Sequence, residues 1–148
     1  MPGKWVRLAG VANGTTGGTV NYLVAPVRLL DARSGASSGL VNRGALTGNE
    51  IYTLPVAGLS GSGIPSNAQG LICNVTVLGP GGNGNLSLFP AGAAVPTTAS
   101  LTFLAGAYLA NHVSSALGSG GGNQGKVNIQ NQSGASTPLV LDAVAYVS

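Results

Sequence analysis

The chain has 148 residues, of which 44% are apolar and only 6% are charged, and its formal net charge is +3. This length corresponds to one domain, and the high apolar and low charged content exclude an intrinsically disordered chain. The six basic residues form no run, which argues against a nucleic-acid-binding surface, and no stretch of about 18 apolar residues predicts a membrane span.

Short strand patterns dominate the chain, and no segment keeps helical periodicity over three turns. In the clearest patterns, 71–78 and 126–130, apolar and polar residues alternate. The segment 138–147 is apolar on both faces apart from Asp142, as is typical of a central strand, whereas 105–117 would also permit a short helix. In chain order, the strand candidates are 4–11, 19–24, 26–31, 50–57, 71–78, 85–89, 98–104, 108–117, 126–130 and 138–147.

Glycine-rich turn signals, such as 79–84 and 118–125, separate these candidates. The spacing of strands and turns predicts an all-β fold, an antiparallel β-sandwich that is jelly-roll-like, with short strands and Gly-rich loops. Residues 25–148 are expected to form this single domain. Residues 1–24 are expected to form an N-terminal arm or an extra strand.

One short stretch holds three of the nine charged residues of the chain, namely Arg28, Asp31 and Arg33. Asp142 lies in the most apolar strand candidate, where an unpaired carboxylate would be very costly, so it needs a cationic partner. Arg28 or Arg33 is the natural partner because a guanidinium offers five donors. On a regular strand, Asp31 and Arg33 share one face and Arg28 points to the other.

We therefore predict a structural ion-pair network of Arg28, Asp31, Arg33 and Asp142 that ties an early strand to the last one. In this network Asp142 is expected to be buried. The alternative is a pair of carboxylates that performs general acid–base catalysis. The apolar residues that flank both aspartates favour the structural interpretation.

Several motifs lack the context that their chemistry needs. Residues 120–126, GGGNQGK, match part of a phosphate-binding loop, but Val127 follows in place of Ser or Thr, and a strand pattern replaces the helix. Cys73 is expected to be a buried, inert thiol. The only histidine, His112, has too few candidate ligands for a zinc site and is interpreted with Asn111 as a structural pair. The sequence predicts no catalytic, cofactor-binding or metal site, and a protein that is not an enzyme.

Seven short motifs follow one another over residues 25–147: Pro26-Val27-Arg28-Leu29-Leu30-Asp31-Ala32-Arg33, Gly63-Ile64-Pro65, Asn74-Val75-Thr76, Leu88-Phe89-Pro90-Ala91-Gly92, Ser100-Leu101-Thr102-Phe103, Gly106 with Ala110-Asn111, and Leu141-Asp142-Ala143-Val144-Ala145-Tyr146. Their order resembles that of an all-β accessory domain found in secreted bacterial cell-surface proteins and cell-wall hydrolases. The chain departs from that pattern at Ala32, Thr102 and Ala145, where the domain has Thr, Asn and Gly. The resemblance implies a non-catalytic all-β module of exported proteins.

Two functions from different classes follow. The first is a structural protein of a larger assembly, most simply a phage capsid decoration or fibre-head protein. If Met1 is the native start, the N-terminus MPGKWVRLAG lacks the apolar region of a secretory signal, as expected of a virion protein made in the host cytoplasm. The alternative is a cell-wall or capsule carbohydrate-binding module, extracellular or at the cell surface, as the resemblance implies.

The scarcity of charge also predicts self-association, because interface cores are depleted in charged residues. We expect a homotrimer attached to a capsid or other large assembly through its N-terminal region. Lys4, Trp5, Arg7 and Tyr22 are the candidate contact residues, and the rings of Trp5 and Tyr22 are also candidates for stacking on a sugar. Neither a cofactor, nor a nucleic acid, nor a membrane is an expected partner.

Overall fold

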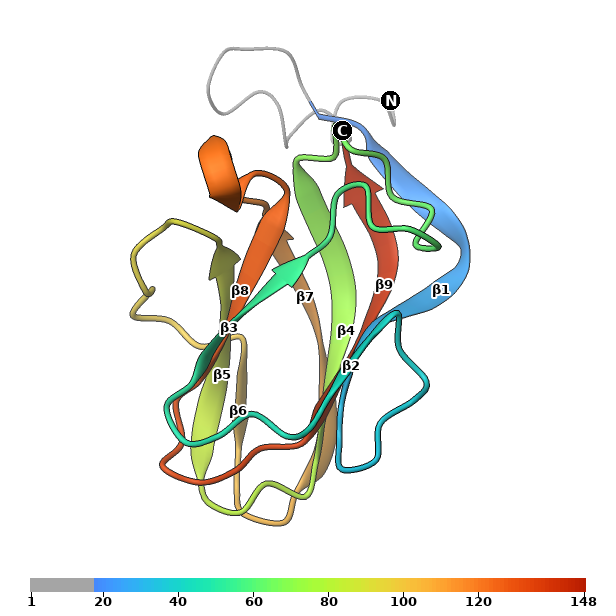
Figure 1. The fold of residues 1–148 in the computed structure, drawn as a ribbon. Coiled ribbons are helices and arrows are strands. Elements are labelled where there is room, and N and C mark those ends of the chain that lie inside the picture. Colours follow the sequence, from blue (N-terminus) through green and yellow to red (C-terminus); the bar gives the residue numbers. More distant parts are fainter. Residues whose placement is uncertain (1–17) are drawn as a thin grey trace, which may run out of the picture.

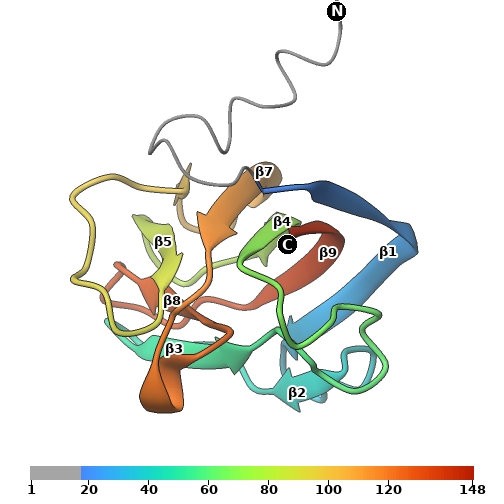
Figure 2. The same ribbon diagram turned by 90° about the horizontal axis from the view of Figure 1, so that it is seen from above.

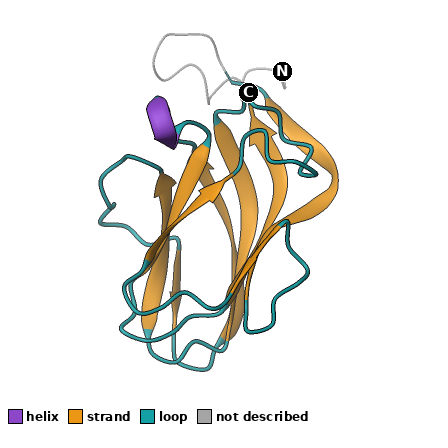
Figure 3. Ribbon diagram, in the orientation of Figure 1, coloured by secondary structure: helices purple, strands orange, loops and turns teal. Residues whose placement is uncertain are grey.

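The computed structural model describes residues 18–148, which form nine strands and one single-turn 3-10 helix (Figures 1 and 3). The predicted all-β class is confirmed. The elements are β1 (Val20–Ala32), β2 (Val41–Arg43), β3 (Ile51–Pro55), β4 (Gly70–Leu78), β5 (Gly84–Pro90), β6 (Leu101–Phe103), β7 (Tyr108–Ala116), η1 (Gly121–Asn123), β8 (Lys126–Asn131) and β9 (Leu139–Val147).

The strands form two sheets that face each other. One has five strands in the order β2-β1-β9-β4-β7, and the other has four in the order β3-β8-β5-β6. All neighbouring strands are antiparallel except β1 and β2, which are parallel. Figure 2 shows β1, β4, β7 and β9 in one layer and β3, β5 and β8 in the other. The strand order is that of a two-sheet sandwich, and its jelly-roll character stays a prediction.

One hydrophobic core fills the space between the sheets, with buried residues from both. The alternation in β4 turns Cys73, Val75 and Val77 into this core, and Val127 and Ile129 of β8 enter it from the other sheet. Side chains of successive strand residues point to opposite faces, so this period-2 pattern places one face of each sheet in the core. The alternation predicted over 71–78 and 126–130 is confirmed.

β1 is longer and less regular than the sequence predicted. The candidates 19–24 and 26–31 form one strand, and the domain boundary placed after residue 24 falls inside it. Tyr22 pairs with Ala145 and Val27 with Ala143, so the four residues 23–26 stand opposite one residue of β9. Pro26 lies in this interruption, where its missing N–H removes no ladder bond. The candidate strand 4–11 lies outside the described residues.

The segment 105–117, for which a helix was also considered, contains the strand β7. All nine of its residues pair in unbroken antiparallel register with β4. Its Ala and Leu content favours a helix only weakly, and burial of Val113 and Leu117 in the core outweighs that preference. The three-residue strand β2 had no signal in the sequence.

The connection between β7 and β8 depends on one close approach. A Cβ at Gly118 would lie 2.5 Å from the carbonyl oxygen of Ala91, with the carbonyl oxygen of Asn123 equally close. Gly118→Ala should therefore force the backbone to move, at a cost of about 1–3 kcal/mol. The matched control is Gly122→Ala in the same loop, where a Cβ meets nothing within 4 Å. Denaturant unfolding of both variants measures the difference, and equal stabilities would refute this account of the loop.

Candidate functional site

The charge cluster of β1 lies on the outer face of the five-stranded sheet. Arg28 pairs with Asp142 and Asp31 pairs with Val140, with a register shift between Arg28 and Leu30. Because Asp142 and Val140 are two residues apart on β9, they share one face, and so do their partners. The prediction that Arg28 points away from Asp31 is therefore wrong, since the shift inserts one extra residue between them.

All four predicted residues join one network, in which Ser38 is the fifth member. Arg28 donates to Asp142 from Nε to Oδ1 at 2.8 Å and from Nη2 to Oδ2 at 3.2 Å. Arg33 donates to Asp31 in the same bidentate way, at 2.7 and 2.9 Å. The Ser38 hydroxyl donates to Asp31 Oδ2 at 2.7 Å and accepts from both arginines at 3.2 Å. It therefore connects the two ion pairs.

The buried carboxylate is that of Asp31 and not, as predicted, that of Asp142. The Asp31 side chain is fully buried, whereas that of Asp142 is 23% exposed. Asp142 faces outward because its neighbours Leu141 and Ala143 occupy the core-facing positions of β9. The guanidinium of Arg33, helped by the hydroxyl and backbone N–H of Ser38, holds the pKa of Asp31 well below its usual range.

A third ion pair, between Arg43 and Glu50, was not predicted. Arg43 at the end of β2 donates to Glu50 at 2.6 and 2.8 Å, and its guanidinium carbon lies 4.8 Å from the centre of the Tyr52 ring. Glu50 also accepts from the Thr47 backbone N–H, which closes the turn before β3. Arg43 lowers the pKa of Glu50 from 4.5 to about 2. The two residues are seven apart, and the segment between them has no strand pattern, so only their opposite charges could have suggested the pair.

These contacts use up almost all the charged side chains of the described part. Asp31, Asp142 and Glu50 are the only acidic residues of the chain, and each is paired with an arginine. Within residues 18–148, Lys126 is the one charged side chain outside an ion pair. The carboxylates therefore hold strands and loops together, and the surface of residues 18–148 is close to neutral.

An apolar depression of about 420 Å³ lies at the start of β1, where the ladder with β9 is interrupted. Tyr22 is 79% exposed and Val24 is fully exposed. Leu40, which is 42% exposed, packs against Gly61 at the same place. Among residues 18–148, no charged side chain lines the depression, whose walls are Tyr22, Leu23, Val24, Ala25, Val27, Gly61, Ser62, Gly63 and Tyr146. Of the predicted contact residues, Tyr22 lies here, whereas Lys4, Trp5 and Arg7 lie outside the described residues.

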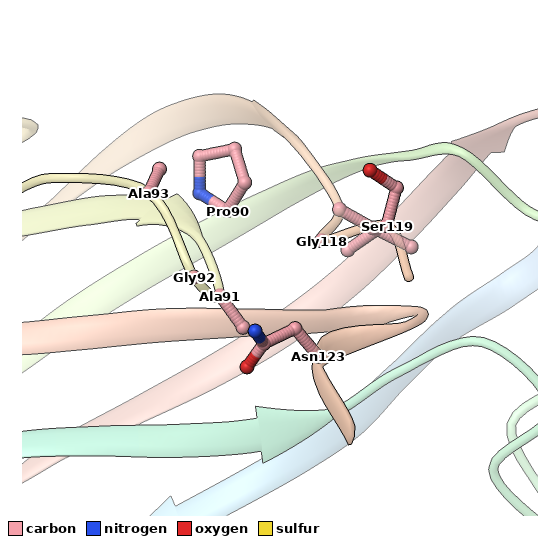
Figure 4. Close-up of a pocket in the computed structure, with 8 residues that line it drawn as sticks. Pro90, Ala91, Gly92, Ala93, Gly118, Ser119 and Asn123 are labelled. Carbon is pink, nitrogen blue, oxygen red and sulfur yellow. The ribbon is translucent and has the colours of Figure 1, made fainter. Parts of the chain in front are cut away.

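A second depression, of about 380 Å³, lies between the loop after β5 and the β7–β8 connection (Figure 4). Most of the residues that line it have small side chains. Among the lining residues of the described part, Ser119 and Asn123 are the two with polar side chains. The glycine-rich segment 120–126 forms part of this connection, and Lys126 is the first residue of β8. The segment therefore leads from strand to strand, and no helix N-terminus follows it as a phosphate-binding loop requires.

The remaining reactive side chains are dispersed. Cys73 is buried, as predicted, and burial raises the pKa of its thiol to about 12. Asn111 is engaged structurally, since it accepts from the His112 backbone N–H and donates to the Ser100 carbonyl. The His112 side chain is exposed on β7. Residues 18–148 hold no cluster of three His, Cys, Asp or Glu side chains that could bind a metal, and no helix among them is long and apolar enough to span a bilayer.

Comparison with known proteins returns no matching family model, no matching curated protein and no matching solved structure. The function must therefore be argued from the surfaces of the chain itself.

The two aspartates of the network should differ in their contribution to stability. Asp31→Asn removes a fully buried carboxylate that accepts from Arg33 and Ser38, and it should cost about 1–3 kcal/mol. Asp142→Asn breaks a partly exposed pair and should cost about 1 kcal/mol or less. Urea unfolding at neutral pH compares the variants with the parent. A larger loss for Asp142→Asn would show that the wrong carboxylate has been identified as the structural one.

Acid should weaken the ion pairs of Asp31 and Glu50. A carboxyl whose pKa is lowered by folding contributes stability above its unfolded pKa and loses that contribution as the pH falls through its folded pKa. For Glu50 this interval runs from 4.5 down to about 2, and for Asp31 it begins at 3.8. The free-energy gap between the parent and Asp31→Asn should therefore narrow below pH 3.8. A difference in unfolding free energy that stays constant down to pH 2 would contradict this prediction.

Proposed function

We propose that this chain is a non-catalytic structural protein of a phage virion, a capsid decoration or fibre-head protein that self-associates as a homotrimer. The observation that carries the proposal is the uncharged apolar depression at the start of β1, bordered by exposed Tyr22 and Val24. Contiguous exposed apolar surface on a domain marks a place of contact with another macromolecule.

A second copy of the chain is the occupant that fits this depression best. Charged residues are depleted in interface cores, and here the lining has none while tyrosine, an interface-enriched residue, supplies two rings. Burial of the exposed Val24 and Tyr22 side chains would remove apolar area from water, worth about 25 cal/mol for each Å². Residues 18–148 are close to neutral because each acidic residue pairs with an arginine, which limits like-charge repulsion between identical copies.

The position of the depression also supports attachment through the N-terminal region. Tyr22 follows Lys4, Trp5 and Arg7 in the sequence, and these four residues are the predicted contacts. In this proposal the N-terminal segment reaches the capsid or another large assembly, while the depression receives the neighbouring copy. The protein would then be located in the virion and made in the host cytoplasm.

A second candidate function is a cell-wall or capsule carbohydrate-binding module, extracellular or at the cell surface. A separate observation favours it: the outer face of β4 and β7 carries hydrogen-bonding side chains and the exposed ring of Tyr108. This face does not overlap the depression at Tyr22, so the two proposals can be tested independently.

Light scattering on the full chain tests the assembly proposal. The expected mass is three times the 14.4 kDa of one chain, and the double variant Tyr22→Ser with Val24→Ser should be monomeric. Leu104→Ser is the matched control, because Leu104 is a 69% exposed apolar residue outside the depression. A monomeric parent at micromolar concentration, or equal dissociation of the control, would remove the proposal.

A further inference from the structure

A row of four polar side chains crosses the outer face of the five-stranded sheet. Arg28 of β1 is paired in register with Asp142 of β9, Asp142 with Asn74 of β4, and Asn74 with His112 of β7. Neighbouring strands are about 4.8 Å apart, so the row runs about 14 Å from Arg28 to His112. Side chains directly opposite in antiparallel pairs share one face, and the row therefore presents its polar groups together.

The two halves of this row differ in their hydrogen bonding. Arg28 and Asp142 are held rigidly by their bidentate pair and by Ser38. The side chains of Asn74 and His112 form no hydrogen bond with any other residue of the described part. Asn74 is half-buried in the floor of the face and His112 is exposed at its edge. An amide and an imidazole thus offer donors and acceptors side by side, next to a fixed ion pair.

The side chains next to Asn74 and His112 on this face are mostly small or polar. Thr76 pairs with Ala110, and Ser114, two residues after His112, pairs with the partly exposed Ile72. Tyr108 lies further along the same face, 76% exposed, about 13 Å along β7 from His112 at the usual rise per strand residue. The face therefore combines hydrogen-bonding groups with one exposed aromatic ring.

We propose that this face, formed by Asn74, Thr76, Tyr108, Ala110, His112 and the Arg28–Asp142 pair, binds a neutral oligosaccharide. This inference rests on the second candidate function above and names its site and ligand class. Sugar hydroxyls act both as donors and as acceptors, which matches the amide of Asn74 and the imidazole of His112. The ring of Tyr108 offers an apolar surface for the C–H face of a sugar. Arg28 and Asp142 neutralise each other, so the face has no net charge with which to attract an anionic ligand.

A peptide that adds to the sheet at the β7 edge is a different occupant, and the structure disfavours it. One backbone donor in the middle of that edge, the N–H of His112, already donates to Asn111, whose amide is held by the carbonyl of Ser100. A strand that pairs there would have to displace the hydrogen bond of the His112 N–H. The binding surface is therefore the face of the sheet and not its edge.

The test is a 15N NMR titration of the full chain with five neutral tetrasaccharides, built from glucose in α and β linkage, N-acetylglucosamine, mannose and xylose. At least one should shift the signals of Asn74, Thr76, Ala110 and His112. Asn74→Ala and His112→Ala should each weaken that binding by about 3- to 10-fold, the loss expected for one or two hydrogen bonds. Thr53→Ala, which removes an exposed polar side chain from β3 on the other sheet, should leave the affinity unchanged.

Three outcomes would overturn the inference: no shift with any of the five sugars at millimolar concentration, shifts confined to other surfaces, or stronger binding of tetragalacturonate than of every neutral sugar. The monomeric Tyr22→Ser, Val24→Ser variant should bind the sugar like the parent. Loss of the trimer and loss of sugar binding are thus separate results, and either proposal can fail alone.

Discussion

The buried carboxylate of Asp31 constrains much of the architecture around β1. It lies on the outer face of a sheet, where the hydrophobic core cannot cover it, so the loop 33–40 must close over it and supply Arg33 and Ser38. This closure brings Leu40 back to donate to the Arg28 carbonyl and starts the parallel strand β2 beside β1. Gly39 fits there because a Cβ would lie 2.7 Å from the Asp31 nitrogen. One desolvated charge thus determines a loop, a turn and an edge strand.

The scarcity of charge follows from this use of charged residues. Each acidic residue forms an ion pair with an arginine, and this pair connects the strands or loops in which the two residues lie. A guanidinium suits this role because it can donate to two carboxylate oxygens at once. The remaining surface has little with which to steer a charged partner over a distance. Recognition on such a surface must come from apolar contact, shape and short-range hydrogen bonds. Both surfaces proposed for binding are of this kind.

The sequence predicts the strands correctly where apolar and polar residues alternate regularly. It does not predict the structure where the backbone is irregular. Residues 71–78 and 126–130 alternate strictly, and their strands lie where expected. The need of a carboxylate in a strand for a cationic partner predicted Arg28 or Arg33 as the partner of Asp142, and Arg28 is the one that binds it. Which aspartate is buried depends on the closure of the loop 33–40 over Asp31, and no pattern in the sequence marks that closure. Ser38 was not predicted because it contacts Asp31 and the two arginines only when the loop 33–40 has closed.

The two irregularities of β1 account for both candidate surfaces. The interruption at residues 23–26 takes Val24 out of the ladder and leaves the apolar depression beside Tyr22. The shift after Arg28 turns this residue to the face of Asp142, which completes the polar row toward His112. A perfectly alternating strand would have had neither feature, because every outward position would have continued the regular pattern of its neighbours. Bulges change the direction of side chains in this way. In β1, both proposed binding surfaces lie next to such a departure from regular alternation.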